Sequence, residues 1–450
     1  MDRRALLLGG AAALTGRAAL AQQSCFNVLD CFSTRPRLPA PSLDLVLLGP
    51  TLDPRITFTR ASTATYFDVT GTMQTAVTDA PRFDYNPVTH AARGLLVEEA
   101  RTNLALNSGN ASLWGFSSAV TRTANAGIAP DGTNTATMVA DTVANSQHVC
   151  GPTTVTVTAN TSYVFSVYIK PAGRPRVNIT LINSGFASGI NTTLNVTTGV
   201  VVTGPLYTGT ASGGFCSITA AGNGWYRCVV GGIIDAASTA AVGGIYLGNG
   251  TSNSYAGDGV SGALVWGGQI EAGAFATTYI PTTAAAATRA VEVATMPVGA
   301  WFNAPQGTLS VEGLYSIVQG PTFPIVVQFN DATLNNTISI LSRHDNAPNA
   351  MQASIIVAGV ANSPTPAVLG AATPNVPFRA AIAWLTATSR ARISASYSSI
   401  VDEQTAPIPA VTVLQFGNRS DNTRSLDGYI RRIQYWPIAL SAAQLQAITQ

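Results

Sequence analysis

Apolar and polar residues alternate in short runs along most of this chain. Ile56-Thr57-Phe58-Thr59 and Val155-Thr156-Val157-Thr158 alternate strictly, and Tyr163–Ile169 is a fuller run that ends at Lys170-Pro171. A period of two is typical of strands, and the Gly, Asn, Asp and Pro residues between the runs are turn formers. The same pattern predicts strands at Val177–Leu181, Trp225–Val230, Ala263–Ile270, Thr308–Leu314, Ile325–Phe329, Thr337–Leu341, Ala380–Leu385, Arg392–Tyr397 and Tyr429–Tyr435.

Helical signals are scarce, and the best one lies at the end of the chain. Ser441 is a favourable N-cap for a short helix that carries Leu445 and Ile448 three positions apart. Many short strands with turns between them indicate antiparallel sheets, and a sheet that buries one face needs a second sheet to cover it. The predicted fold is therefore all-β, built from tandem antiparallel β-sandwiches.

The composition narrows the function classes. Of the 450 residues, 46% are hydrophobic and only 10% are charged, against the ~25% charged residues usual for soluble domains. Such sparse charge excludes charged disorder, coiled coils and long solvated helices. A formal net charge of +2 offers no cation cluster to neutralise phosphates, so nucleic-acid binding is not expected.

The first 21 residues read as a unit of their own. Arg3-Arg4 is followed by the apolar run Ala5–Leu14, by Arg17 and by Ala19-Leu20-Ala21. This segment resembles a bacterial twin-arginine export signal. The alternative is a short helix that is retained as a docking segment in a larger particle. The apolar run is too short to cross ~30 Å of hydrocarbon, so no membrane span is expected.

The leader also accounts for the net charge. Of 24 basic and 22 acidic residues, residues 1–21 hold three arginines and one aspartate, which leaves 21 of each sign in the rest of the chain. A ligand of this neutral remainder is expected to be held by hydrogen bonds and ring stacking rather than by electrostatic attraction.

Five cysteines include one pair with suggestive spacing. Cys216 and Cys228 flank a turn predicted at Ala221–Gly224, so they could face each other across a hairpin and form a disulfide. An export compartment would allow two disulfides and one free thiol. The remaining cysteines are Cys25, Cys31 and Cys150.

Three stretches near the N-terminus have unusual sequences: Ile56–Tyr66 (ITFTRASTATY), Ala80–Pro87 (APRFDYNP) and Gly94–Leu104 (GLLVEEARTNL). Together they resemble a segment that recurs in tail-fibre and head-spike-fibre proteins of tailed bacteriophages and prophages. The resemblance implies a component of a virion or phage-like particle, and fibres of this kind are commonly trimers.

The middle of the chain resembles another family. Its marks are Tyr163–Lys170, Gly224–Arg227 (GWYR) and Val265–Glu271 followed by Tyr279–Thr282. They resemble the jelly-roll carbohydrate-binding modules that often follow the fibre-like segment. The resemblance covers about residues 105–283.

The C-terminal third closes with Leu426–Trp436 (LDGYIRRIQYW) and Ala439-Leu440-Ser441, and is similar to the laminin-G/concanavalin-A-like lectin sandwich. The fold implied is a jelly roll followed by a concanavalin-A-like sandwich, after a small N-terminal β segment. The expected division is a leader at 1–21, a Pro-rich linker at 22–50, a fibre-like β segment at 51–104, a jelly roll at 105–283, a linker at 284–305 and a laminin-G-like module at 306–450.

Large aromatic residues in these strands have two interpretations. Trp225 follows a Gly-Asn-Gly turn in an alternating strand, where a large ring usually fills the space between two sheets. The same interpretation is given to Trp266 and Trp436. The alternative for each is a platform on which a sugar stacks.

Catalytic patterns are missing from the sequence. Glycoside hydrolysis needs two carboxylates ~5–9.5 Å apart across a cleft, whereas the adjacent Glu98 and Glu99 would point to opposite faces of a strand. No Gly-x-Ser-x-Gly elbow occurs, and the three histidines, His90, His148 and His344, have no evident catalytic or zinc partner. The chain is expected to be non-enzymatic, with no certain cofactor.

Binding remains, and polar loops are the candidates. Sugar sites combine planar hydrogen-bonding side chains with an aromatic ring, sometimes with Ca²⁺ held by oxygen ligands. The alternative is that Asn, Asp and Ser in these loops simply form turns. The candidate glycan- or calcium-binding residues are Asp331, Arg343, His344, Asp345, Asn346, Asn418, Arg419 and Asp421 in the C-terminal module, and Asn249, Tyr255 and Asp258 in the middle module.

Three functions are weighed. The first is a fibre or spike component that binds cell-surface polysaccharide of a host, where several copies offset modest affinity at each site; its partners would be host glycan, other particle subunits and further copies of itself. The second is a structural protein that decorates a particle without binding glycan. The third is an exported periplasmic or extracellular lectin or glycan-processing enzyme.

Overall fold

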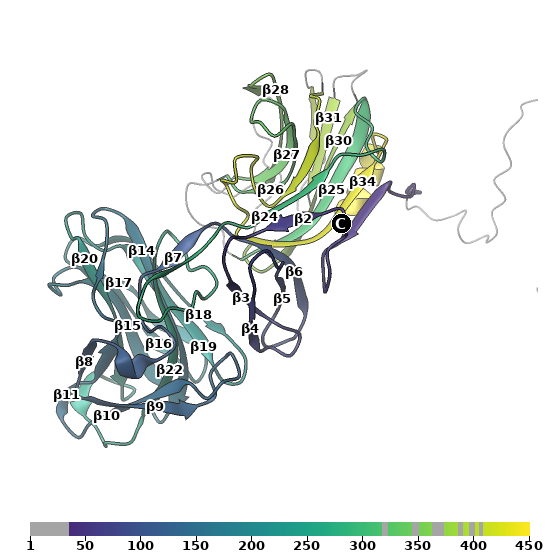
Figure 1. The fold of residues 1–450 in the computed structure, drawn as a ribbon. Helices are drawn as coiled ribbons and strands as arrows, with labels where there is room; N and C mark the ends of the chain where they lie inside the picture. The colour runs from purple at the N-terminus through teal and green to yellow at the C-terminus, as the bar shows by residue number, and fades with distance from the viewer. Residues whose placement is uncertain are drawn as a thin grey trace, which may run out of the picture. The chain divides into compact units, whose positions relative to one another are not determined.

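The computed structural model describes residues 36–316, 323–343, 351–361, 373–385, 390–395, 401–404 and 408–450. Residues 39–450 form one compact unit, and of the other unit, Met1–Leu38, only residues 36–38 are described. The predicted leader lies outside the described residues, as do Cys25, Cys31, His344, Asp345 and Asn346. Within the described ranges the chain is almost entirely β-structure in antiparallel sheets, which confirms the predicted fold class (Figure 1).

One sandwich, named the split sandwich, takes strands from both ends of the chain. In spatial order its first sheet comprises β32 (Val401–Gln404), β31 (Arg390–Ala395), β30 (Pro377–Leu385), β25 (Gln306–Tyr315), β34 (Gly428–Trp436), β6 (Ala92–Val97) and β5 (Phe83–Tyr85), and β1 (Leu43–Val46) also pairs with β34. The second sheet comprises β2 (Thr57–Thr59), β24 (Val293–Pro297), β33 (Val413–Phe416), β26 (Ile325–Asn330), β27 (Thr337–Ser342), β28 (Met351–Val357) and β29 (Val360–Ala361).

The two sheets of the split sandwich share one apolar core. Leu95 of β6, Ile433 of β34 and Phe329 of β26 all belong to it and are fully buried. Because alternate residues of each strand point to the inner face, the two sheets can cover each other's inner face and remove its apolar surface from water.

The N-terminal segment differs from its predicted role as a separate unit. β2, β5 and β6, all within residues 51–104, complete the split sandwich, and the ranges expected to be linkers, 22–50 and 284–305, contain β1 and β24. Alternation identifies a strand but not its partner, since backbone pairing does not depend on distance along the chain.

The second sandwich, named the inserted sandwich, occupies residues 105–283 and interrupts the split sandwich in sequence (blue to teal in Figure 1). One sheet comprises β18 (Ser212–Ala220), β19 (Tyr226–Ile233), β14 (Ser162–Ala172), β22 (Gly262–Ala272), β10 (Ala136–Asp141) and β9 (Val120–Gly127). The other comprises β17 (Val200–Thr208), β16 (Gly189–Asn195), β15 (Arg176–Asn183), β20 (Ala240–Gly248), β12 (Val149–Gly151) and β8 (Phe116–Ser118), with β13 (Val155–Thr156) on β20.

Short elements join these layers. The strands that lead into and out of the inserted sandwich, β7 (Arg101–Asn103) and β23 (Ala287–Arg289), pair with each other. β3 (Ala64–Phe67) and β4 (Met73–Ala76) form a hairpin, and β11 (Asn145–Gln147) pairs with the distant β21 (Ser254–Ala256). A 3₁₀ turn, η2, spans Ala111–Leu113, and the predicted helix is confirmed as α1 (Ala442–Thr449), with Ser441 and Gln444 in a capping box.

Trp225, Trp266 and Trp436 are buried as predicted, but not between paired sheets. Val265 of β22 lies in the core of the inserted sandwich, whereas its neighbour Trp266 points to the other face of the sheet. There it joins a cluster with Trp225, named the outer cluster. Its members are Met73, Ala129, Ala136, Tyr168, Ala221, Trp225, Trp266 and Tyr279. Trp436 likewise packs outside the split sandwich core, against Leu445 of α1.

The disulfide expected between Cys216 and Cys228 is not formed, and both are free thiols. Cys216 is opposite Val230, and Cys228 is opposite Ile218, so the two cysteines are two residues out of register. Diagonal neighbours of this kind lie about 7–8 Å apart, beyond the reach of an unstrained disulfide. Cys150, also free, is buried.

In the part of the chain that the structure describes, no helix has the length and apolar character needed to cross a bilayer.

Candidate functional site

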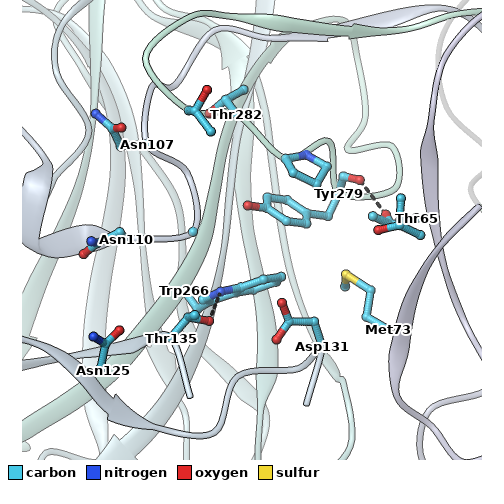
Figure 2. A pocket seen from close by; sticks show the side chains of 14 residues that line it. Thr65, Met73, Asn107, Asn110, Asn125, Asp131, Thr135, Trp266, Tyr279 and Thr282 are labelled. Carbon is cyan, nitrogen blue, oxygen red and sulfur yellow. Dashed lines mark hydrogen bonds between the residues drawn. The ribbon is translucent and has the colours of Figure 1, made fainter. Parts of the chain in front are cut away.

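A cavity of about 340 Å³ lies beside the outer cluster, where the β3–β4 hairpin meets the inserted sandwich. This volume falls in the range of roughly 300–1,000 Å³ typical of ligand sites. Its lining combines two aromatic rings, three asparagines, one carboxylate and one thioether. These are Trp266, Tyr279, Asn107, Asn110, Asn125, Asp131 and Met73 (Figure 2).

The two rings are anchored through their polar atoms. Their centroids are 4.7 Å apart with an interplanar angle of 52°. Trp266 Nε1 donates to Thr135 Oγ1 (3.1 Å), and the Tyr279 hydroxyl bonds Ser108 Oγ (2.7 Å). Burial raises the pKa of Tyr279, so its ring remains a neutral phenol. Rings fixed in this way need no further ordering when a ligand binds.

The strand that carries Trp266 is irregular at the next residue, Gly267. Gly267 has φ +66°, and the register of β22 against β14 shifts between Ser166 and Tyr168. A Cβ at position 267 would lie only 2.8 Å from the Tyr168 ring. Glycine is therefore required, and the irregularity follows directly after Trp266, which faces outward because it alternates with Val265.

Polar side chains in the lining of the cavity have unused hydrogen-bonding capacity. Asn110 Oδ1 caps η2 by accepting from Ser112 N (3.1 Å), and Asp131 Oδ1 accepts from Thr133 N (3.0 Å). Among the described residues, the side-chain amides of Asn107 and Asn125 and the Oδ2 atom of Asp131 form no hydrogen bond. These groups can donate to and accept from a ligand.

The β3–β4 hairpin supplies the opposite wall. Thr65 Oγ1 donates to the Tyr279 carbonyl oxygen (2.5 Å), and Met73 packs in the outer cluster. Gly109 leaves space in front of the rings, since a Cβ there would lie 3.5 Å from Trp266 Nε1 and 3.7 Å from the Tyr279 hydroxyl, ordinary contact distances.

A buried ion network supports the backbone next to Tyr279. Its members, named the junction network, are Arg60, Arg82, Glu98, Arg289 and Glu292. Glu98 accepts hydrogen bonds from the backbone N (2.9 Å) and Oγ1 (2.6 Å) of Thr278. Because Thr278 precedes Tyr279, the network ties the inserted sandwich and its candidate site to the split sandwich.

Arg82 is the centre of this network. Its Nη2 lies 2.7 Å from Glu98 Oε2 and 2.5 Å from Glu292 Oε2, and its Nε donates to Glu292 Oε1 (2.7 Å). Burial favours the protonated form of Glu98, but Arg289 and Arg82 overcome it and lower the pKa of Glu98 to about 2. The carboxylate thus stays ionised in the interior.

The predicted C-terminal loops come together, but their carboxylates are occupied by their own turns. Ser420 Oγ donates to the Thr333 carbonyl oxygen (2.9 Å), which joins the two loops. Asp331 accepts from Thr333 and from Asn336 Nδ2, and Asp421 is paired with Arg419 at 2.6 Å. These bonds lower the pKa of both aspartates, with Thr333 as the leading cause for Asp331 and Arg419 for Asp421.

Two other predicted residues of that module have structural contacts. Asn418 is fully buried and donates through Nδ2 to the Glu292 carbonyl oxygen. The guanidinium of Arg343 lies 4.6 Å from the Phe323 ring centroid. Both contacts order the loops of the split sandwich.

The predicted loop of the inserted sandwich is organised around Asp141, which is buried. Tyr255 donates its hydroxyl to Asp141 Oδ2 (2.9 Å), and Arg174 bridges Asp141 (2.7 Å) and Asp258 (3.1 Å). Asn249 Oδ1 accepts from backbone groups two and three residues ahead, which is an ordinary turn. Within the described ranges, no group of three or more His, Cys, Asp or Glu residues could hold a metal ion.

The cavity residues were only partly visible in the sequence. Trp266 and Tyr279 belong to stretches that mark the middle module, but only Trp266 was interpreted, as a packing residue with a sugar platform as the alternative. Tyr279, Asp131 and Asn125 were not proposed as site residues. The alternation of side chains along β22 could have identified Trp266, because Val265 and Trp266 are consecutive and must face opposite sides of one sheet. A tryptophan on the side away from the sandwich core needs either a covering segment or a ligand.

No model of a protein family matches this chain, and no curated protein sequence matches it. Among solved structures it is similar to the NanB sialidase of Streptococcus pneumoniae, with 12% identity over 33% of this chain and 24% of the sialidase chain and a TM-score of 0.28. It is also similar to a heptameric SAP-like pentraxin of Limulus polyphemus (11% identity, 33% and 70% coverage, TM-score 0.24) and to domains LG4-5 of the mouse laminin α1 chain (9% identity, 67% and 88% coverage, TM-score 0.18). The chain spans about a quarter of the sialidase, and at these TM-scores the likenesses carry no inference about the site.

Proposed function

We propose that the cavity beside Trp266 and Tyr279 binds a carbohydrate without changing it chemically. The supporting observation is the combination of two anchored rings with free amide and carboxylate groups. Sugar rings offer apolar C–H faces for the aromatic side chains and hydroxyl groups for Asn107, Asn125 and Asp131. Of the described lining residues Asp131 alone is charged, which suits a ligand recognised by hydrogen bonding and stacking.

The biological setting of this proposal is a virion or phage-like particle. The chain would be a fibre or spike component that attaches to the surface polysaccharide of a host, assembled with other particle subunits and as a homotrimer. The fibre-like stretches at residues 56–104 support this setting, and multiple copies would raise the avidity of a modest single site.

Two other settings compete with it. A particle decoration protein would use the same surfaces against protein neighbours and bind no glycan. An exported lectin or glycan-processing enzyme would use residues 1–21 as a twin-arginine signal. N-terminal sequencing of the native protein separates these settings: a start at Gln22 means export, whereas a start at Met1 or Asp2 favours assembly into a particle.

Filling the space at Gly109 is expected to weaken carbohydrate binding. Gly109→Gln would push a polar chain in front of the rings, whereas Gly109→Ala adds only a Cβ at ordinary contact distance. On a glycan array followed by titration calorimetry, Gly109→Gln should lose about tenfold or more in affinity for any glycan that the unaltered protein binds, and Gly109→Ala should change little.

Two tryptophans of the outer cluster provide a matched control. Trp266→Phe removes the indole that lines the cavity, and Trp225→Phe makes the same change in a buried residue that does not line it. Only Trp266→Phe should weaken binding. Equal losses in both variants, or full binding by Gly109→Gln, would place the glycan elsewhere.

A further inference from the structure

A second cavity of about 240 Å³ adjoins the candidate sugar site. The two cavities share Thr65, Met73 and Tyr279 as common wall residues. The two cavities therefore lie side by side, so that neighbouring units of one oligosaccharide would occupy one cavity each. What the second cavity adds is charge, since its lining includes Asp84, Arg93, Glu98 and Arg227.

Both carboxylates of the second cavity are already saturated. Asp84 accepts from Phe67 N (2.6 Å), the Tyr429 hydroxyl (2.8 Å) and Arg93 Nη1 (3.1 Å). Glu98 is held by the junction network and by Thr278. Neither acid is left to balance a further cation.

Arg227 also lines the second cavity, and its hydrogen-bond acceptors are uncharged. Its Nη2 donates to Ser166 Oγ (3.0 Å) and to the Thr277 carbonyl oxygen (2.5 Å), both uncharged acceptors. Among the described residues it has no carboxylate partner within ion-pair distance, its buried Nε lacks any hydrogen-bond partner, and its Nη1 forms no hydrogen bond. A guanidinium with two unused donor positions is suited to a planar anion.

Aromatic rings surround the guanidinium of Arg227 and restrict which ligands can pair with its charge. The guanidinium carbon lies 5.7 Å from the centroid of the Tyr168 ring, which is buried. Phe67 and Phe215 also line the cavity. The apolar part of a ligand in this space would contact these aromatic rings, and an anionic oxygen of the ligand would bind Arg227.

The geometry points to an acidic carbohydrate as the ligand, with a neutral sugar in the first cavity and a carboxylate- or sulfate-bearing sugar in the second, its anionic group at Arg227. This inference rests on the proposed function of the first cavity and adds the chemical class of the glycan. Charge-assisted hydrogen bonds to the guanidinium supply the preference for the acidic form.

The test compares matched ligands and matched variants. The probes are an oligosaccharide that contains uronic acid, the same oligosaccharide with its carboxyl groups reduced to alcohols, and a sulfated neutral oligosaccharide, each titrated calorimetrically. The unaltered protein should bind an acidic form about tenfold or more tightly than the reduced form, and the preference should shrink as salt is added. The uronic and sulfated probes distinguish the two kinds of anion.

Arg227→Gln should bind the acidic and reduced forms about equally, and urea unfolding followed by tryptophan fluorescence checks that this variant is folded. Arg227→Lys should keep part of the preference. Arg176→Gln is the control, because Arg176 is half-buried on the opposite sheet and lines neither cavity.

Equal binding of acidic and reduced forms by the unaltered protein, or an undiminished preference in Arg227→Gln, would overturn the inference and leave the proposed sugar site standing. Failure of the unaltered protein to bind any of the three probes or any glycan on an array would overturn the proposed function itself, and the inference with it.

Discussion

Replacing Arg82 by methionine is expected to lower the free energy of unfolding by about 3–5 kcal/mol, the largest effect predicted for a single substitution in this chain. The side chain of Arg82 has no solvent exposure and lies between the carboxylates of Glu98 and Glu292. Methionine fills a similar volume but leaves both acids in the interior with less compensation. The uncompensated charge, rather than lost contact area, dominates the cost.

Urea unfolding followed by tryptophan fluorescence measures this change. Arg432→Met is the matched control, since Arg432 forms an ion pair with Asp44 in which both side chains are substantially exposed, and such pairs contribute about 0–1 kcal/mol. A loss in Arg82→Met no larger than that in the control would contradict the role assigned to the junction network. Because the network holds Thr278, the variant should also bind glycan more weakly.

The second large effect is a loss of stability in acid. The pKa of Glu98 is lowered to about 2 in the folded protein from an ordinary 4.5. A depressed carboxyl pKa contributes stability that is fully present above the unfolded value and disappears as the pH falls from about 4.5 toward 2. At 1.36 kcal/mol per pKa unit, the contribution is about 3 kcal/mol.

The free energy of unfolding, measured by urea titration at several pH values, should therefore fall through this window. Glu98→Gln cannot titrate at this position, so its curve should be flatter between pH 4.5 and 2, although it starts lower because Arg82 and Arg289 each lose one carboxylate partner. Burial raises the pKa of Asp84, so this group contributes to the pH dependence of stability in the opposite direction. The comparison is therefore repeated in an Asp84→Asn background, which removes the contribution of Asp84. Parallel acid curves for the unaltered protein and Glu98→Gln would refute the assignment.

The fibre-like stretches acquire a physical explanation from these contacts. Five polar residues of these stretches are buried: Arg60, Arg82, Glu98, Arg101 and Asn103. Asn103, for example, donates to the carbonyl oxygens of Gly268 and Ile280 and accepts from the backbone of Ala105 and Ile270. The residues that carry the resemblance to fibre proteins are therefore residues that join the two sandwiches in this structure.

The candidate site was harder to anticipate than the fold. Asp331 and Asp421 have the residue types of a calcium or sugar site, yet the bonds that they form are those of turns. The cavity residues come instead from β22, from the segment 279–283 that follows it, from the loop at residues 107–110, from the end of β9 and the loop after it, and from the hairpin at residues 64–76. No local pattern connects segments so far apart.

The sequence by itself determined the local structure. Alternation predicted the strands, turn residues separated them, and Ser441 capped the terminal helix, because each depends on neighbouring residues and on which face of a strand is apolar. Only the tertiary structure decided the partners: that β6 pairs with β34, that Cys228 faces Ile218 rather than Cys216, and that Trp266 faces a cavity. Backbone hydrogen bonding is the same for every residue pair, so register and partner follow from the packing of whole faces, which a one-dimensional pattern does not contain.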